Sequence, residues 1–326
     1  MCEPVARITQ KSAEDGIYVL ENNTDRPFAQ GYFLAWFLEY EGFVIDKGEI
    51  ICDASPHGST EFCWSHDLPQ NGVSAVLFSV VSREDGDYSP RDREYAYAQF
   101  ILCDPEKNIS LPACDQPMKC EETPSLVAMH APSFAVALSK ETMLPLQWVF
   151  SGMPLLDRPA TLTAGEMAIR AFRPAVNAGK ARGDAHALFA CLDSAEHPFA
   201  AGEIRWSING NGAALLSVVP DVCEQQCILR LAVSSALDYV EYFGMTPSPT
   251  PDGAQSDPVL KLEEGPRSKE DIKVIACRSA SFSSGDVTLH LIPSRPLDMS
   301  IGDDLTIDIP CGCEILISAE YEGENA

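Results

Sequence analysis

The chain has 326 residues, of which 45% are hydrophobic, so it is long enough to bury two separate cores. Its 48 acidic and 23 basic side chains give a formal net charge of -25 at pH 7. Such a charge repels phosphate backbones and anionic lipid surfaces, which argues against nucleic acid and membranes as partners. No apolar run approaches the roughly 18 residues of a membrane span, and the N-terminus lacks the features of a signal peptide. We therefore expect a soluble, cytoplasmic protein.

The twelve cysteines do not predict a disulfide framework, because the chain is long and is not expected to be exported. Two close pairs, Cys223 with Cys227 and Cys311 with Cys313, come nearest to a metal-ligand pattern. Neither is a CxxC pair, and the six histidines are scattered along the chain. We predict reduced thiols, no metal site and no cofactor.

Short apolar segments separated by turn signals fill the first 103 residues, which is typical of an antiparallel sandwich. The clearest strand is 32–40, because a large aromatic or leucine side chain occupies every second position. The other strands predicted here are 16–21, 44–52, 61–64, 73–81 and 94–103. About seven strands in roughly a hundred residues is the size of an immunoglobulin-like sandwich.

Residues 104–123 are rich in proline and charge and have no periodicity, so we expect them to connect two domains, 1–118 and 119–326. Many strand-sized runs follow, too many for one small sandwich, and they predict a large two-sheet sandwich. These runs are 134–138, 147–150, 169–173, 204–208, 213–219, 228–233, 240–243, 274–277, 287–292, 305–309 and 314–319.

Three further segments of the second half have distinct patterns. Residues 180–193 are the one short-helix candidate, because Ala187, Leu188 and Cys191 fall near one side of a helix. Residues 245–258 carry proline or glycine at almost every third position and predict a long loop. The sequence INGNG at 208–212 is typical of a hairpin turn.

Motifs for the common catalytic chemistries are absent from the sequence. Neither GxGxxG nor GxxxxGK[ST] occurs, so a phosphate-binding loop is not expected, and the GxSxG of α/β-hydrolases is missing. A glycosidase needs two facing carboxylates, but 48 acidic residues make some pair inevitable. We predict no catalytic residue and interpret the carboxylates on strands as solvated. These carboxylates belong to Glu39, Glu61, Glu94 and Glu203.

Aromatic side chains are candidates for a sugar-binding platform, since aromatic rings stack on pyranose faces. Trp36, Trp148 and Trp206 lie within apolar alternation and are predicted to pack in cores. Trp64 and Tyr88 are predicted to be more exposed. The histidines are interpreted as turn or surface residues, namely His57, His66 and His290.

Several segments resemble the region that follows the catalytic barrel in family-2 β-galactosidases. EPVARI at residues 3–8 and GYFLAWFLEYEGFVIDKGEI at 31–50 resemble the opening of the family's sandwich. VLFSVVSREDGDYSPRDREYAYAQFIL at 76–102 resembles its closing strand, loop and strand, with Glu94, Ala96 and Gln99 kept. Tyr88 stands where the family has a tryptophan, and residues 92–93 stand where it has a glycine-histidine pair.

The second half resembles the family's final domain more loosely. IRAFRPAVNAGKARG at 169–183 resembles a motif of arginine and proline followed by acidic residues and asparagine, of which Phe172, Arg173, Pro174 and Asn177 correspond. The resemblance implies an all-β chain with an immunoglobulin-like β-sandwich followed by a larger galactose-mutarotase-like β-sandwich. It also implies that Arg173, Asn177 and Tyr88 contact carbohydrate or an interface.

The family's catalytic acid and nucleophile lie on a barrel that this chain does not contain. The resemblance therefore implies a non-catalytic C-terminal portion or small subunit of a β-galactosidase, bracing a separate barrel that hydrolyses β-galactosides such as lactose. The expected partners are a catalytic large subunit, a galactoside sugar and, in a homo-oligomer, further copies of the chain. Two alternatives stay open: a stand-alone carbohydrate-binding module, and a remnant that binds nothing.

Overall fold

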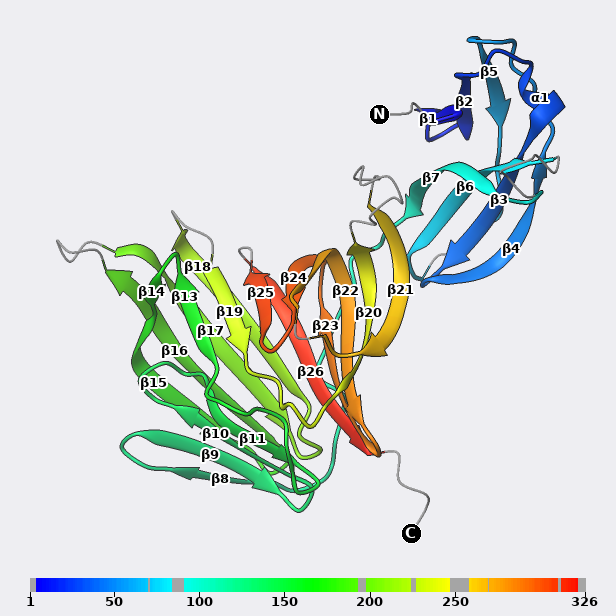
Figure 1. Ribbon diagram of the computed structural model, residues 1–326. Helices are drawn as coiled ribbons and strands as arrows, with labels where there is room; N and C mark the ends of the chain where they lie inside the picture. Colours follow the sequence, from blue (N-terminus) through cyan, green and yellow to red (C-terminus); the bar gives the residue numbers. More distant parts are fainter. Residues whose placement is uncertain are drawn as a thin grey trace. The chain divides into compact units, whose positions relative to one another are not determined.

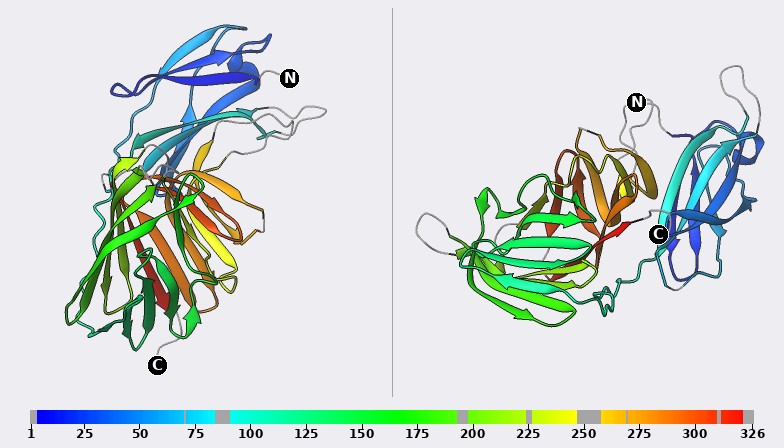
Figure 2. Two further views of the ribbon diagram at one scale, coloured as in Figure 1. Left: turned by 90° about the vertical axis from the view of Figure 1, so that its left-hand side faces the viewer. Right: turned by 90° about the horizontal axis from the view of Figure 1, so that it is seen from below.

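The computed structural model describes residues 4–69, 71–83, 91–192, 198–223, 227–246, 258–268, 270–309 and 312–321 (Figures 1 and 2). The chain forms two compact units, one of Met1–Pro105 with Pro247–Leu262 and the other of Glu106–Thr246 with Glu263–Ala326. The residues from Glu106 to the expected boundary at 118 thus belong to the second unit. They bond there, since the Lys107 amide donates to the Ser294 carbonyl and the Asn209 side chain donates to the Pro112 carbonyl.

The first unit contains two antiparallel sheets in the strand orders β1-β2-β5 and β4-β3-β6-β7. Alternate side chains of both sheets enter one core, where the Tyr18 and Phe78 rings lie 4.8 Å apart. The elements are β1 (Ala6–Ser12), β2 (Ile17–Asn22), α1 (Phe28–Gly31), β3 (Tyr32–Tyr40), β4 (Phe43–Ile50), β5 (Ser59–Cys63), β6 (Ser74–Ser82) and β7 (Glu94–Cys103). The predicted immunoglobulin-like sandwich is confirmed.

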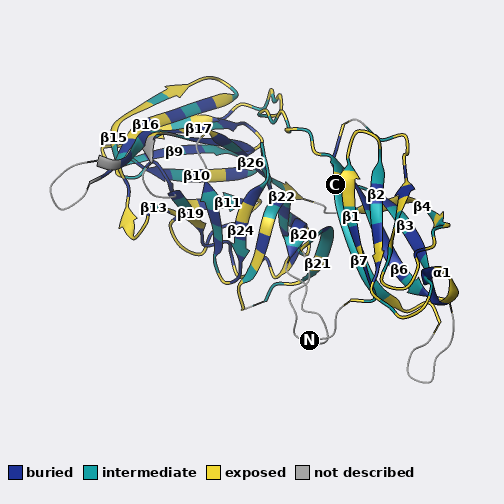
Figure 3. Ribbon diagram, turned by 90° about the horizontal axis from the view of Figure 1, so that it is seen from above, coloured by how far each residue is buried: buried dark blue, intermediate teal, exposed yellow. Residues whose placement is uncertain are grey.

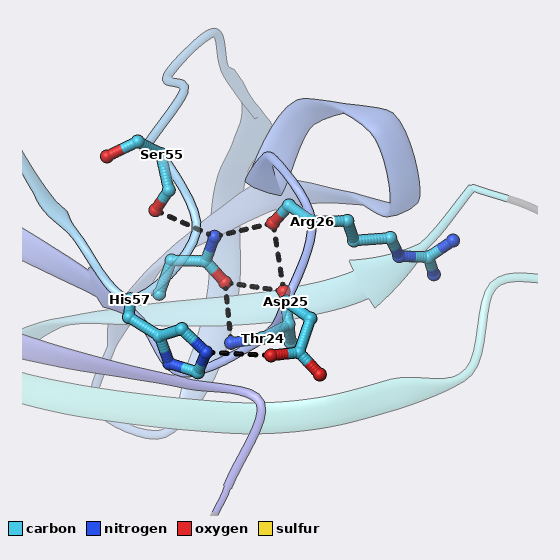
Figure 4. Close-up of polar contacts among 6 residues, drawn as sticks. Thr24, Asp25, Arg26, Ser55 and His57 are labelled. Carbon is cyan, nitrogen blue, oxygen red and sulfur yellow. Dashed lines mark hydrogen bonds and ion pairs between the residues drawn. The ribbon is translucent and has the colours of Figure 1, made fainter.

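A buried asparagine fastens two loops of this unit to each other (Figure 4). Asn22 is 1% exposed, and its amide nitrogen lies 2.8, 3.2 and 3.1 Å from the carbonyl oxygens of Arg26, Ala54 and Ser55. Its side-chain oxygen accepts from the backbone and hydroxyl of Thr24. All the hydrogen-bonding capacity of this buried amide is therefore used, as burial of a polar group requires.

At the surface of the same loops, the His57 Nε2 atom lies 2.8 Å from Asp25 Oδ1. His57 has a φ of +51°, which non-glycine residues rarely adopt. Both side chains are largely exposed, so this contact adds little to stability.

The second unit is a larger sandwich of one five-stranded and one 14-stranded sheet over a single core. The five-stranded sheet has the order β12-β11-β10-β9-β8, and the main path of the other is β14-β13-β19-β25-β24-β22-β23-β26-β18-β17-β16-β15. The strands are β8 (Lys119–Glu122), β9 (Leu126–Ala131), β10 (Phe134–Ser139), β11 (Pro145–Phe150), β12 (Met153–Pro154), β13 (Thr161–Ala164), β14 (Met167–Ala168), β15 (Arg170–Ala178), β16 (Arg182–Leu192), β17 (Pro198–Asn209), β18 (Ala214–Cys223), β19 (Cys227–Leu231), β20 (Tyr239–Thr246), β21 (Val259–Pro266), β22 (Ile272–Ser284), β23 (Val287–Pro293), β24 (Leu297–Ile301), β25 (Leu305–Ile309) and β26 (Cys313–Tyr321). The residues of β21 up to Leu262 belong to the first unit.

Strand β22 joins the two halves of the 14-stranded sheet. Its first residues, up to Cys277, pair with β24, and its last residues, from Ala280, pair with β23. A register shift lies between Val274 and Cys277, and Ala276 within it has a φ of +50°. Such a bulge bends a strand, so one strand can serve both halves of the sheet.

The sequence-based predictions for this unit are confirmed in class and wrong in one element. The chain is nearly all strand, as predicted, and the 208–212 hairpin is present, with Ile208 paired to Ala214. The predicted helix at 180–193 is instead strand β16. Its buried side chains, Ala185, Ala187 and Phe189, recur at every second position, so sheet packing overrides the helix preference of alanine.

The predicted core tryptophans are partly confirmed. Trp148 and Trp206 are 3% and 1% exposed and lie in edge-to-face contact, while Trp36 is half-buried. Trp64 was expected to be more exposed, but it is 8% exposed and packs edge-to-face against Trp36. Within the residues described, no helix is long and apolar enough to cross a membrane.

Candidate functional site

Strands β15, β16 and β17 form the end of the large sheet and present one face away from the core. Along β16 and β17, alternate residues enter the core, so those between them point outward. We call the outward set the β15–β17 face; it comprises Phe172, Asn177, Asp184, His186, Leu188, Glu203, Arg205 and Ser207. The cross-strand pairing places these side chains in neighbouring rows.

The first row of the face carries a hydrogen-bonded carboxylate. Asn177 lies directly opposite Asp184, and Asp184 lies opposite Ser207. The Asp184 carboxylate accepts a hydrogen bond of 2.5 Å from the Ser207 hydroxyl and one of 2.9 Å from Arg182 Nε. Within the described residues the side chain of Asn177 carries no hydrogen bond, so its amide is available to a ligand.

The neighbouring rows contain an ion pair beside a histidine. Arg205 donates to Glu203 over 2.5 Å, and His186 lies opposite Arg205 on β16. The hydrogen bond from Arg205, and then the charges of Arg205 and His186, hold the pKa of Glu203 below its usual value. Glu203 raises the pKa of Arg205 in return, so both groups stay charged at neutral pH.

An exposed apolar pair lies next to these charges. Phe172 and Leu188 face each other across β15 and β16, and each is 44% exposed. The opposite partner of Leu188 on β17 is Glu203. The face therefore combines an aromatic ring that can stack on a sugar with charged and amide groups that can bond its hydroxyls.

Strand β15 is the edge of the sheet and contains a bulge. The register shifts between Phe172 and Ala175, and Arg173 has a φ of +52°. Pro174, which has no N–H to donate, follows within the same irregularity. Phe172 therefore lies before the bulge, opposite Leu188, and Asn177 lies after it, opposite Asp184.

Of the residues that the resemblance implied, Arg173 and Asn177 are exposed on β15, four positions apart. Tyr88 lies outside the described residues. Asp184 and His186 were not singled out from the sequence, because residues 180–193 were interpreted as a helix. Arg205 lies in the predicted strand 204–208 and was not singled out either. The alternation of polar with small side chains over 182–187 was the signal that could have found Asp184 and His186.

The face supports binding chemistry better than proton transfer. Glu203 remains an ionised partner of Arg205, so it is a poor general acid at neutral pH. Among the described residues, no group of three or more His, Cys, Asp or Glu side chains could hold a metal ion. Hydrogen bonds to hydroxyl groups and ring stacking are the interactions that these side chains offer.

A second polar row lies further along the same sheet. Ser281 Oγ is 2.8 Å from His290 Nδ1, and His290 Nε2 is 3.8 Å from Glu320. His290 is thus part of strand β23 and half-buried, rather than in a turn. Ser281 is paired with Glu241 on β20 and with His290 on β23 in regular antiparallel ladders. The backbone N–H groups beside Ser281 therefore bond within the sheet and are not available as an oxyanion hole for acyl transfer.

No family model matches the sequence, and no curated protein matches it. Among solved structures, a galactose 1-epimerase from Lactobacillus acidophilus is similar at 9% identity and a TM-score of 0.43, over 63% of this chain and 98% of that one. A putative aldose 1-epimerase from Escherichia coli K12 is similar at 7% identity and a TM-score of 0.40, over 63% and 99%. A putative mutarotase from Salmonella typhimurium is similar at 10% identity and a TM-score of 0.39, over 65% and 97%.

Proposed function

We propose that this chain is a non-catalytic, sugar-contacting part of a β-galactosidase, acting as its C-terminal portion or small subunit beside a separate catalytic barrel. The observation that carries the proposal is the β15–β17 face, where Phe172 and Leu188 form an exposed apolar platform beside Glu203 and Arg205. A terminal galactoside has an apolar patch and several hydroxyls, and these match such a surface.

The residues kept in the resemblance also support the proposal, because two of them bond within the first unit. Glu94 accepts a hydrogen bond of 2.5 Å from the Ser79 hydroxyl. Gln99 donates to Glu39 over 2.6 Å, and its amide exchanges two hydrogen bonds with the backbone of Leu260. These hydrogen bonds give Glu94 and Gln99 a structural role, and no catalytic role is needed to account for them.

The test is co-expression with the barrel chain of the same genome that carries the two catalytic glutamates. We expect the two chains to co-purify and the pair to hydrolyse nitrophenyl β-galactoside faster than the barrel alone. Failure to associate, or association without a gain in hydrolysis, would contradict the proposal.

A matched pair of variants connects the gain to the β15–β17 face. Arg205→Met removes the guanidinium paired with Glu203, whereas Arg158→Met removes one paired equally closely, at 2.5 Å, with Asp304. Arg158 is not part of the face. We expect Arg205→Met to raise the KM of the complex for the galactoside and Arg158→Met to leave it unchanged.

A second candidate function, stand-alone carbohydrate binding, is favoured by the openness of the face, since β15 is an edge strand with exposed side chains. In that case the chain binds sugar but does not change hydrolysis by a barrel chain. Saturable binding of galactose by the chain alone, with no effect of the chain on any barrel enzyme, would favour this alternative over the first.

A further inference from the structure

Strand β15 carries two arginines that have no bonding partner among the described residues, Arg170 and Arg173. The strand ends the large sheet, and seven of its nine residues are exposed (Figure 3). Arg170 is its first residue, and Arg173 lies in its bulge. An exposed guanidinium without a partner keeps all its N–H donors available to a ligand.

The two neighbouring strands pair their own arginines with carboxylates. On β16, Arg182 bonds to Asp184, two residues further on, and on β17, Arg205 bonds to the glutamate two residues before it. The positions two residues away from Arg170 and Arg173 hold only alanine or phenylalanine. β15 therefore lacks the carboxylates that its neighbours contain, and a ligand can supply them.

The charge around β15 is opposite to the charge of the whole chain. Residues 167–183 contain four basic side chains and no acidic one, in a chain with a formal net charge of -25. Glu141 reaches this strand only through its carbonyl, which accepts a hydrogen bond of 2.6 Å from the Ala171 amide, and within the described residues its carboxylate forms no ion pair. At physiological salt the Debye length is about 8 Å, so an anion at β15 interacts mainly with the local cations.

The two arginines lie on either side of Phe172 along the strand. Arg170 shares the outward face of Phe172, because its partner on β16, Ala190, lies two residues from the partner of Phe172. Arg173 directly follows the ring and is exposed in the bulge. Three residues of strand span about 10 Å, a distance that two long side chains can bridge. A sugar ring stacked on Phe172 therefore lies within reach of both guanidinium groups.

We infer that the sugar bound at the β15–β17 face carries an anionic group, a carboxylate or a sulfate, which Arg170 and Arg173 hold while Phe172 stacks on the ring. This inference rests on the proposed contact of the face with a galactoside, and it names the chemical class of that galactoside. The planar fork of a guanidinium forms two charge-assisted hydrogen bonds with the oxygens of one anionic group. A neutral sugar leaves these donors without a charged acceptor.

The test is calorimetric titration of the full chain with galactose, galacturonate and galactose 6-sulfate at physiological salt. We expect an anionic sugar to bind about tenfold more tightly than galactose, because hydrogen bonds between charged groups are stronger than those to a neutral hydroxyl. Tighter binding of galacturonate identifies the anionic group as a carboxylate, and tighter binding of the sulfated sugar identifies it as a sulfate.

Single variants connect this preference to β15. Arg170→Met and Arg173→Met should each weaken binding of the anionic sugar about fivefold more than binding of galactose. Arg230→Met is the matched control, because Arg230 is also exposed on a strand, bonds to none of the described residues and contributes the same charge. We expect Arg230→Met to leave the preference unchanged.

The outcomes separate this inference from the proposed function. Equal affinities for galactose and both anionic sugars, or equal losses in Arg170→Met and Arg230→Met, would overturn the inference while sugar contact at the β15–β17 face still stands. An absence of binding for all three sugars would overturn both.

Discussion

The buried Asn22 side chain connects two loops of the first unit by hydrogen bonds. Because its amide nitrogen faces the three carbonyls of Arg26, Ala54 and Ser55, Asn22→Asp would place a carboxylate against three acceptors. We expect a loss of about 2–4 kcal/mol in the free energy of unfolding, measured by urea denaturation. The control is Asn23→Asp, which loses one exposed hydrogen bond and should cost less than about 1 kcal/mol. Equal losses in the two variants would refute this role.

His66 provides a pH-dependent contact between β4 and the segment after β5. The Asp67 carbonyl and the Asp46 carboxylate raise the pKa of His66, and the bonds from His66 and from the Lys47 amide lower the pKa of Asp46. Stability from the raised pKa is complete below the ordinary histidine value near pH 6.5 and is lost as the pH rises through the folded value. Stability from the lowered pKa is present above about pH 4 and is lost as the pH falls through the folded value.

Titration of His66 by NMR measures this coupling. Asp46→Asn should lower the pKa of His66, because it removes the carboxylate that favours the imidazolium. Glu49→Gln makes the same change of charge on the same strand, on the opposite face from Asp46, and should leave the titration nearly unchanged. A His66 pKa that is equal in wild type and Asp46→Asn would show that the ion pair does not form in solution.

At the scale of the elements, the hairpin between β17 and β18 requires a glycine at position 212 for two reasons, a positive φ and the close approach of the Phe134 ring. Gly212 has a φ of +83°, and a Cβ there would lie 2.8 Å from the Phe134 ring. Gly152 has the same φ with open space around it. We expect Gly152→Ala to cost about 1 kcal/mol, from backbone strain alone, and Gly212→Ala to cost about 2–4 kcal/mol in urea unfolding. Similar costs would mean that Phe134 moves away freely.

Elements with a strong local pattern could be predicted from the sequence, and those defined by their neighbours could not. The bounds predicted for β3, β7 and β25 are those observed, because their side chains alternate or form continuous apolar runs. β1 was missed because its residues are mostly polar and only Ala6 and Ile8 are buried in it. β16 was taken for a helix because Ala187, Leu188 and Cys191 fall near one side of a helix, and only the pairing with β15 and β17 makes it a strand.

That error also hid part of the candidate site. Arg173 and Asn177 were reached through the resemblance, but Asp184 and His186 face outward only if 182–192 is extended. Glu203 was interpreted as a solvated carboxylate, and its partner Arg205 becomes evident only once the two side chains lie on one face of β17. Cross-strand neighbours are set by register, which a single sequence does not specify.

At the scale of the whole molecule, the described residues form two sandwiches. In the first unit, the Glu94 carboxylate and the Gln99 amide form hydrogen bonds, and the second unit offers a charged face with the exposed Phe172 ring. Activity would then depend on a second chain, while contact with sugar would belong to this one. Variants of the β15–β17 face should therefore affect sugar affinity.

Calorimetric titration of the full chain with galactose and lactose tests the central claim most directly. We expect saturable binding that Arg205→Met weakens about tenfold, since a hydrogen bond from a charged group contributes about 1.5–3 kcal/mol, and that Arg158→Met leaves unchanged. An absence of binding, or equal affinities in the two variants, would contradict the assignment of sugar contact to the β15–β17 face.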